Sequence, residues 1–266
     1  MCTIVAIKRE EAHCPLVVAA NRDEFYSRAT SGPRRITDPL VRGPTILAGI
    51  DLLKGGTWMG ANENGLFVGL TNQRQHEGAD SAKASRGDVV MDALAMSEVA
   101  HIDAFLMDID ARAYNGFNLL YGDATELRVA YARADREAIE IQRLGEGVWV
   151  LSNDTIGSAD FPKTDRVRAL VEPLAQTEFE GLTAGLARAL ADHTQPGIES
   201  VPPPPPGSLF THPILRALQS ICVHTPVYGT RSATMLARRP GGVHYYGYAD
   251  GPPCETAFQD KTELLR

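Results

Sequence analysis

Apolar runs separated by short polar stretches open the chain. Cys2–Ile7 and Pro15–Ala20 are apolar and rich in β-branched residues, and the stretch between them is charged. Two such runs joined by a polar turn predict an antiparallel β-hairpin.

The register of this hairpin has a consequence for the residues at its open end. A turn centred near Glu11 places Cys2 opposite Ala20. The four polar residues Asn21–Glu24 then come just after the second strand. We therefore expect the start of the chain to meet this polar segment.

A second hairpin is indicated further along the chain. Thr57–Gly60 and Leu66–Leu70 are separated by a turn that contains Asn64-Gly65, a strong tight-turn dipeptide. Asn72 follows the end of the returning strand.

Helical spacing and strand-like runs alternate over the rest of the sequence. Apolar residues with helical spacing predict helices over 85–94, 102–109, 163–174, 179–193 and 213–220. Runs bounded by Gly and Asp predict strands over 118–121, 127–132, 138–144, 148–151, 221–225, 232–237, 243–248 and 256–258. Asn153 lies at the exit of the fourth of these strands.

This order of elements favours the α+β class with mostly antiparallel sheets. Hairpins alternate with pairs of helices, and neither a repeated βαβ unit nor a GxGxxG motif is found. Strands from the start, middle and end of the chain would have to share one or two sheets. We therefore expect a single domain over residues 1–266.

Composition and charge limit the classes of partner. With 266 residues, of which 44% are hydrophobic, the chain can bury a substantial core. The formal net charge of -7 argues against nucleic acid as a partner. The sequence has no apolar run of about 20 residues and no leader-like start, so we expect a cytoplasmic protein with no membrane span. The oligomeric state is left open.

The four cysteines are Cys2, Cys14, Cys222 and Cys254. They are too few and too scattered for a disulfide framework, and no CxxC pair indicates a zinc site. No metal site is predicted from this spacing, and no cofactor is required.

Cys2 is the candidate nucleophile. Removal of Met1 would leave a thiol and an α-amine on the same residue, and an α-amine with a pKa of about 7.7–8.0 can accept the proton of a thiol with a pKa of about 8.5. The alternative is a small buried residue in an edge strand.

Polar residues near strand ends complete the candidate site. Asn21, Arg22 and Asp23 are suited to holding an amine, a substrate or an oxyanion, or to ending a strand in a turn. Trp58, beside glycines, can line a ligand cleft or anchor the second hairpin. Side-chain amides at strand exits can stabilise an oxyanion, which makes Asn72 and Asn153 candidates. Arg231, at the start of a late strand, is a further candidate site residue.

A series of motifs resembles the transport and Golgi organisation protein 2 family, also called the NRDE family. They occur in order over nearly the whole chain: Met1–Thr3, Asn21–Glu24, Gly55–Gly60, Ser85–Gly87, Phe117–Leu120, Leu151–Asn153, Pro162–Thr164 and Tyr228–Ser232. The family is similar to the N-terminal-nucleophile (Ntn) hydrolases, which implies a four-layer αββα sandwich.

The resemblance also implies roles for individual residues. In the branch of bile salt hydrolases and penicillin V acylases, the positions that match Cys2, Asp23, Asn72, Asn153 and Arg231 form the catalytic set. An arginine of that branch is replaced here by Ala20, and Arg22 is a candidate substitute. This difference puts bile-salt-type substrates in question.

Two functions from different classes follow. The first is hydrolysis of a small-molecule amide by Cys2, with Asn21, Arg22 and Trp58 binding substrate. The second is a non-catalytic carrier of haem or a similar hydrophobic ligand, because family members are implicated in haem trafficking. Haem needs an axial ligand, for which the candidates are Cys14, in a Cys-Pro pair, and His212, His224 and His244. The proline run 202–206 fits a stiff connection better than a ligand for a partner domain.

Overall fold

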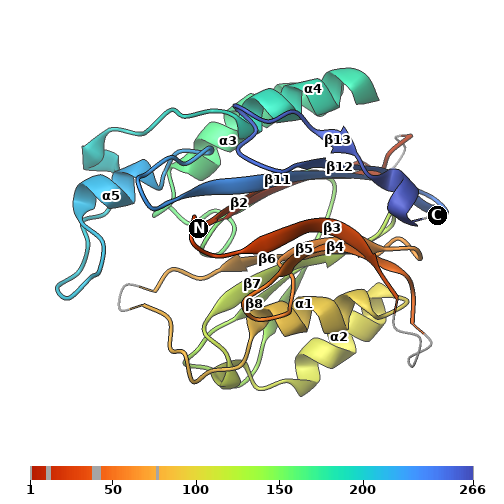
Figure 1. Cartoon of the computed structure of the whole chain (residues 1–266), viewed down its shortest axis with the longest axis horizontal. Helices are drawn as coiled ribbons and strands as arrows, with labels where there is room; N and C mark the ends of the chain where they lie inside the picture. Colours follow the sequence, from red (N-terminus) through yellow and green to blue (C-terminus); the bar gives the residue numbers. More distant parts are fainter. Residues whose placement is uncertain (1, 10–12, 38–42, 76–77, 266) are drawn as a thin grey trace.

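Two antiparallel β-sheets lie face to face, and helices cover the outer face of each (Figure 1). The computed structural model describes residues 2–9, 13–37, 43–75 and 78–265. In this part of the chain one sheet has six strands, in the order β10 (Gly147–Leu151), β1 (Thr3–Lys8), β2 (Leu16–Phe25), β11 (Tyr228–Arg239), β12 (Gly242–Ala249) and β13 (Gln259–Asp260). The other has seven, in the order β3 (Thr30–Ile36), β4 (Ile46–Asp51), β5 (Met59–Asn62), β6 (Phe67–Asn72), β7 (Phe117–Gly122), β8 (Leu127–Ala132) and β9 (Glu140–Leu144).

The helices form the outer layers. α1 (Arg86–Leu94) and α2 (Val99–Asp108) pack on the seven-stranded sheet, and α3 (Lys163–Val171) and α4 (Phe179–Leu190) pack on the six-stranded sheet. α5 (His212–Ala217) lies to one side of the sandwich (Figure 1). Short 3-10 helices occupy Ala111–Ala113, Glu172–Leu174, Ile198–Ser200 and Thr262–Leu265. None of the helices in the described ranges has the length and apolarity needed to cross a membrane.

Side-chain alternation along the strands separates the cores of the sandwich. In β2, Val18 and Ala20 contribute to the core between the sheets, whereas Val17 and Ala19 contribute to the core beneath α3 and α4. Because both faces of the strand are buried, its sequence is a continuous apolar run rather than an alternating one. The predicted αββα sandwich of the α+β class is confirmed.

The first hairpin forms, but its register differs from the prediction by two residues. Ile4, not Cys2, pairs with Ala20, and Thr3 pairs with Asn21. The turn predicted near Glu11 lies outside the described residues. An even shift keeps each side chain on its expected face of the sheet, so Cys2 and Arg22 still share the face between the sheets.

The polar segment Asn21–Glu24 lies inside β2 and not beyond it, contrary to the prediction. The strand continues to Phe25 because β11 supplies ladder partners: Thr230 pairs with Asp23, and Gly229 pairs with Glu24. The strand predicted over 221–225 is also wrong, since the segment makes only one isolated bridge, between His224 and Gly229.

β3 and β4 were not expected from the pattern. β3 is an edge strand of sequence TSGPRRI, with a register irregularity between Ser31 and Arg34. A strand with a proline and polar residues at a sheet edge lacks the apolar signature of buried strands. The other predicted strands and helices overlap observed elements, except that the strand predicted over 256–258 is found just beyond that range, as β13.

Candidate functional site

A cleft of about 280 Å³ opens at one end of the sandwich. Its lining includes Cys2, residues 22–24 of β2, residues 56–58 before β5, and much of the loop and helix start at 79–87. Asn72, the last residue of β6, also faces the cleft. Five sequence-predicted site residues therefore gather here: Cys2, Arg22, Asp23, Trp58 and Asn72.

Cys2 lies at the inner wall of the cleft. It is partly exposed, and its sulfur lies against the backbone N–H of Asp23, because β1 and β2 pair beside it. Burial raises the pKa of the Cys2 thiol, and the hydrogen bond from this N–H and the charge of Arg22 oppose the rise. The position therefore brings a thiol, a backbone donor and a cation together.

The carboxyl group of Asp23 is buried and held from β11. Thr230 donates a hydrogen bond of 2.7 Å from Oγ1 to Oδ1 of Asp23, and the Tyr228 hydroxyl donates one of 2.8 Å to the Asp23 carbonyl. Burial raises the pKa of Asp23, and the nearby Lys163 ammonium and the Thr230 hydrogen bond oppose this rise. The rigid contacts fix the segment of β2 that faces Cys2.

Lys163 is a residue of this site that the sequence did not reveal. It is the first residue of α3 and is only 1% exposed, and its ammonium lies 3.5 Å from the carbonyl oxygen of Leu218. Burial lowers the pKa of Lys163, while the charges of Asp23 and Cys2 act to raise it. Lysine is rarely buried, so the sequence gives no sign of this placement except its occurrence in Pro162–Thr164.

Arg22 stacks on Trp58 inside the cleft. The guanidinium carbon lies 4.3 Å from the indole centroid, and Nη2 lies 3.8 Å from Glu24 Oε2. Nη1 is buried and has no hydrogen-bond partner among the described residues. Because Ala20 and Arg22 are two apart on one strand, Arg22 lies on the face expected for the arginine that Ala20 replaces.

Two further arginines that were not predicted as site residues line the same cleft, and one of them, Arg86, lies in the Ser85–Gly87 motif. Arg28 pairs with Asp51 at 2.5 Å and lies 3.7 Å from Glu24. Arg86, at the start of α1, makes a 3.4 Å hydrogen bond to the Gly116 carbonyl. Burial lowers the pKa of Arg86, which marks a cation that is partly removed from water.

The two asparagines predicted for the oxyanion lie together, but in different roles. Asn72 lines the cleft, whereas buried Asn153 donates a 2.6 Å hydrogen bond from Nδ2 to the Asn72 carbonyl. Asn118 reinforces this junction, because its Nδ2 bonds to Thr71 Oγ1 and to the Ser152 and Asp154 carbonyls. Asn153 thus holds the backbone from which Asn72 projects.

Asn21 and Arg231 are placed differently from the other predicted site residues, although Asn21 borders a small pocket that Cys2, Arg22 and Trp58 also line. The Asn21 amide is 1% exposed and donates 2.8 Å hydrogen bonds to the carbonyls of Leu190 and Ile221, which fasten the end of α4 and the segment after α5 to β2. Arg231 lies at the irregularity of β11 and donates to the Tyr26 carbonyl at 3.1 Å. Neither Asn21 nor Arg231 lines the cleft that holds Cys2.

The four candidate haem ligands occupy separate places. Cys14 is buried under α3 and α4 and borders a second pocket, of about 650 Å³. His212 bonds to the Val201 carbonyl at 2.7 Å, and His244 bonds to Arg239 at 2.8 Å. His224 lies beside Cys222 and Cys254.

Similarity to solved structures identifies the class of fold. The chain superposes over its full length on mutants of the conjugated bile acid hydrolase from Clostridium perfringens, with TM-scores of 0.59 and 0.60 and 13% identity, covering 94% of that chain. Penicillin V acylase from Agrobacterium tumefaciens gives a TM-score of 0.50 at 15% identity, over 100% of this chain and 87% of that one. The fold is that of the Ntn hydrolases.

The sequence then places the chain more narrowly. Residues 1–247 match the family described as "Transport and Golgi organisation 2", and the chain belongs to this family. The Bos taurus transport and Golgi organization protein 2 homolog is 31% identical, with 83% of this chain and 81% of the relative covered. The Homo sapiens homolog is 28% identical with the same shares covered.

Proposed function

We propose that this protein is a cysteine amidohydrolase of the Ntn type that cleaves a C–N bond in a small molecule in the cytoplasm. The observation that carries the proposal is the position of Cys2, whose thiol faces the cleft beside the backbone N–H of Asp23. The names of the structural neighbours, a hydrolase and an acylase, agree with amide cleavage.

The proposed reaction begins with removal of Met1, which leaves the α-amine on Cys2. The amine takes the thiol proton, the sulfur attacks the amide carbonyl, and the proton passes to the leaving amine as the C–N bond breaks. Water then cleaves the thioester, so that the C–S bond breaks and the thiol is restored. The buried carboxyl of Asp23, fixed by Thr230, holds the amine in place.

The oxyanion of the tetrahedral intermediate needs donors near Cys2. The Asn72 side chain faces the cleft and is the donor we assign, while Asn153 positions it from behind. Arg231, with its contact to Tyr26, is assigned no direct step.

The cations of the cleft favour a substrate that carries an anionic group. Arg28 is already paired with Asp51, whereas Arg22 keeps a buried Nη1 without a hydrogen-bond partner in the described residues, and Arg86 is bound only weakly to a carbonyl. A buried donor without a partner costs about 1–3 kcal/mol, and a substrate carboxylate would relieve this cost.

The test combines mass spectrometry with turnover. The intact mass of the purified full chain reports whether Met1 is removed, and a panel of N-acyl amides, with and without a carboxylate, reports hydrolysis. We expect Cys2→Ala to abolish turnover and an acyl adduct to be found on Cys2 in the parent, while Cys14→Ala keeps activity. An active protein that retains Met1, or undiminished turnover in Cys2→Ala, would refute the proposal.

The carrier function is the second candidate, and it stays a prediction. Haem titration followed by the Soret band, in the parent and in variants of Cys14, His212, His224 and His244, tests it directly. Absence of saturable binding would remove it.

A further inference from the structure

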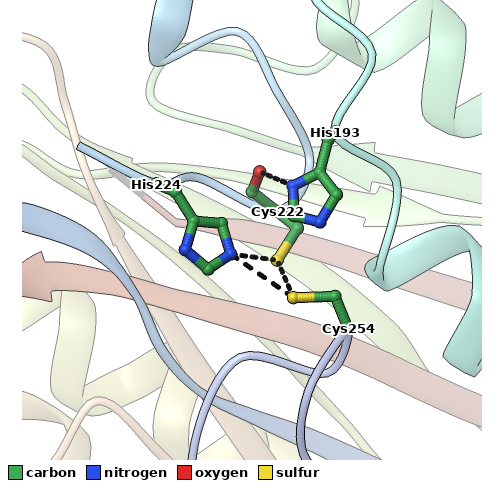
Figure 2. A group of neighbouring side chains, drawn as sticks. All are labelled: His193, Cys222, His224 and Cys254. Carbon is green, nitrogen blue, oxygen red and sulfur yellow. Dashed lines mark hydrogen bonds between the residues drawn. The ribbon is translucent and has the colours of Figure 1, made fainter.

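Two histidines and two cysteines meet at the surface near the end of α4 (Figure 2). They are His193, Cys222, His224 and Cys254, and their potential ligand atoms all lie within 4.8 Å of one another. His193 follows α4, Cys222 and His224 lie between α5 and β11, and Cys254 lies between β12 and β13. Three segments distant in sequence therefore supply one cluster.

The distances between these atoms match the edges of a metal-centred tetrahedron. The two sulfurs are 3.7 Å apart, and His224 Nε2 lies 3.7 Å from Cys222 Sγ and 3.3 Å from Cys254 Sγ. With Zn–S of about 2.3 Å and Zn–N of about 2.0–2.1 Å, a tetrahedron has S···S edges of about 3.8 Å and S···N edges of about 3.5 Å.

The orientation of His193 is the second observation that favours a metal. Its Nδ1 lies 3.1 Å from the Cys222 carbonyl oxygen, as Figure 2 shows. A histidine that donates one ring N–H to a backbone carbonyl keeps the other nitrogen unprotonated, which is the usual arrangement of a metal-bound imidazole. The His193 ring also lies close to that of His224, with 5.0 Å between centroids.

We propose that His193, Cys222, His224 and Cys254 form a structural Zn²⁺ site. A set of two thiolates and two imidazoles suits zinc, and four protein ligands leave no position for water or substrate, which is the mark of a structural rather than a catalytic site. Bound Zn²⁺ fastens the loop that carries Cys254 to the body of the sandwich.

The site shares its framework with the cleft. Asn21 binds the Leu190 and Ile221 carbonyls beside the ligand-bearing segments, and the Cys222 N–H donates to the Asp192 carbonyl at 2.9 Å. These contacts hold His193 and Cys222 near one another whether or not an ion is bound. The hydrogen bonds of Asn21 therefore connect β2 to the segments that carry His193 and Cys222.

A disulfide between Cys222 and Cys254 is the competing use of the same thiols. Their sulfurs are 3.7 Å apart, well beyond the S–S bond length of about 2.0 Å, and both cysteines are free. A disulfide would also not account for the positions of His193 and His224 beside the two thiols.

The experiment measures metal binding by the full chain. Reduced, chelator-treated protein is titrated with Co²⁺ and then with Zn²⁺. We expect the visible absorption of a tetrahedral cobalt thiolate to saturate at one ion per chain, Zn²⁺ to displace it, and the melting temperature to rise with Zn²⁺. Cys254→Ser and His224→Ala, both at exposed positions, should lose the band and the rise in melting temperature while keeping the parent's circular dichroism.

Matched controls lie outside the cluster. Cys14→Ala and His101→Ala remove one thiol and one imidazole, and we expect both variants to bind Co²⁺ like the parent. The proposal is overturned if the parent binds no more Co²⁺ than Cys254→Ser, or if mass spectrometry of the freshly isolated protein finds Cys222 and Cys254 joined in a disulfide. Neither result depends on the amidase activity.

Discussion

The hydroxyl of Thr230 links Asp23 to the backbone of a neighbouring segment. It donates to Asp23 Oδ1 at 2.7 Å and accepts from the N–H of Val223 at 2.9 Å, and Thr230 is only 1% exposed. Val223 lies between two ligands of the proposed zinc site. One buried hydroxyl therefore joins the residue that faces Cys2 to the segment that carries Cys222 and His224.

Replacing Thr230 by valine should destabilise the fold. The change keeps the shape of the side chain but leaves the buried Val223 N–H without its acceptor and removes the hydrogen bond from Thr230 to Asp23, at a cost of about 1–3 kcal/mol. Chemical denaturation gives the free energy of unfolding, and Thr230→Ser, which keeps the hydroxyl, should recover most of the loss. Equal stability of the valine and serine variants would contradict this role.

The sequence predicts the layers of the fold because burial on both faces leaves continuous apolar runs in strands such as β1 and β2. It does not predict that Asn21–Glu24 remain in β2, because their ladder partners in β11 are remote in sequence. Polar residues usually end a strand, and only the tertiary pairing overrides that preference.

The candidate site is predicted in part, for a similar reason. Cys2, Asp23 and Asn72 follow from motifs and strand ends, whereas Lys163 and Arg86 are ordinary charged residues until the fold buries Lys163 and half-buries Arg86. The four residues of the proposed zinc site form no CxxC pair, because they come from three segments. The sequence carries one local sign of this cluster, the spacing of Cys222 and His224. Residues two apart in an extended chain share a face, so these two side chains can reach the same ion.

The stability of the protein should fall at alkaline pH, in part through Tyr248. Burial raises the pKa of Tyr248 to about 12, with Asp250 contributing, whereas an unfolded tyrosine titrates near pH 10. The folded state holds the proton more tightly, so this stabilisation is complete below pH of about 10 and is lost as the pH rises towards about 12.

Tyr248→Phe removes this titration and tests its sign. The melting temperature of the variant should fall less steeply than that of the parent between pH of about 9 and 11. Tyr26→Phe, at a residue 37% exposed, serves as the control and should follow the parent. Parallel curves for Tyr248→Phe and the parent would show that Tyr248 has no such role.

Arg22 and Arg86 should select for anionic substrates, if the proposed amidase activity is present. Each charge-assisted hydrogen bond contributes about 1.5–3 kcal/mol, so Arg22→Gln and Arg86→Gln should raise the KM for a carboxylated amide about tenfold or more. The KM for the matching neutral amide should change little. Lys54→Gln, at an exposed residue that lines the cleft, is the control and should leave both KM values unchanged. If Arg22→Gln and Arg86→Gln change the KM of the carboxylated and neutral amides equally, the assignment is contradicted.

Asn118 should be essential to the geometry of Asn72 although it lies behind the cleft. Its fully buried amide joins β7 to Thr71 and to the turn at Ser152 and Asp154. Asn118→Ala removes four hydrogen bonds, the three donated by its Nδ2 and the one that its Oδ1 accepts from Gln73 Nε2. It should lower the free energy of unfolding by about 2–4 kcal/mol, because buried polar groups lose partners. Asn64→Ala, in an exposed turn, should cost far less. A small loss in both variants, measured by denaturation, would show that Asn153 and the strands hold Asn72 without this amide.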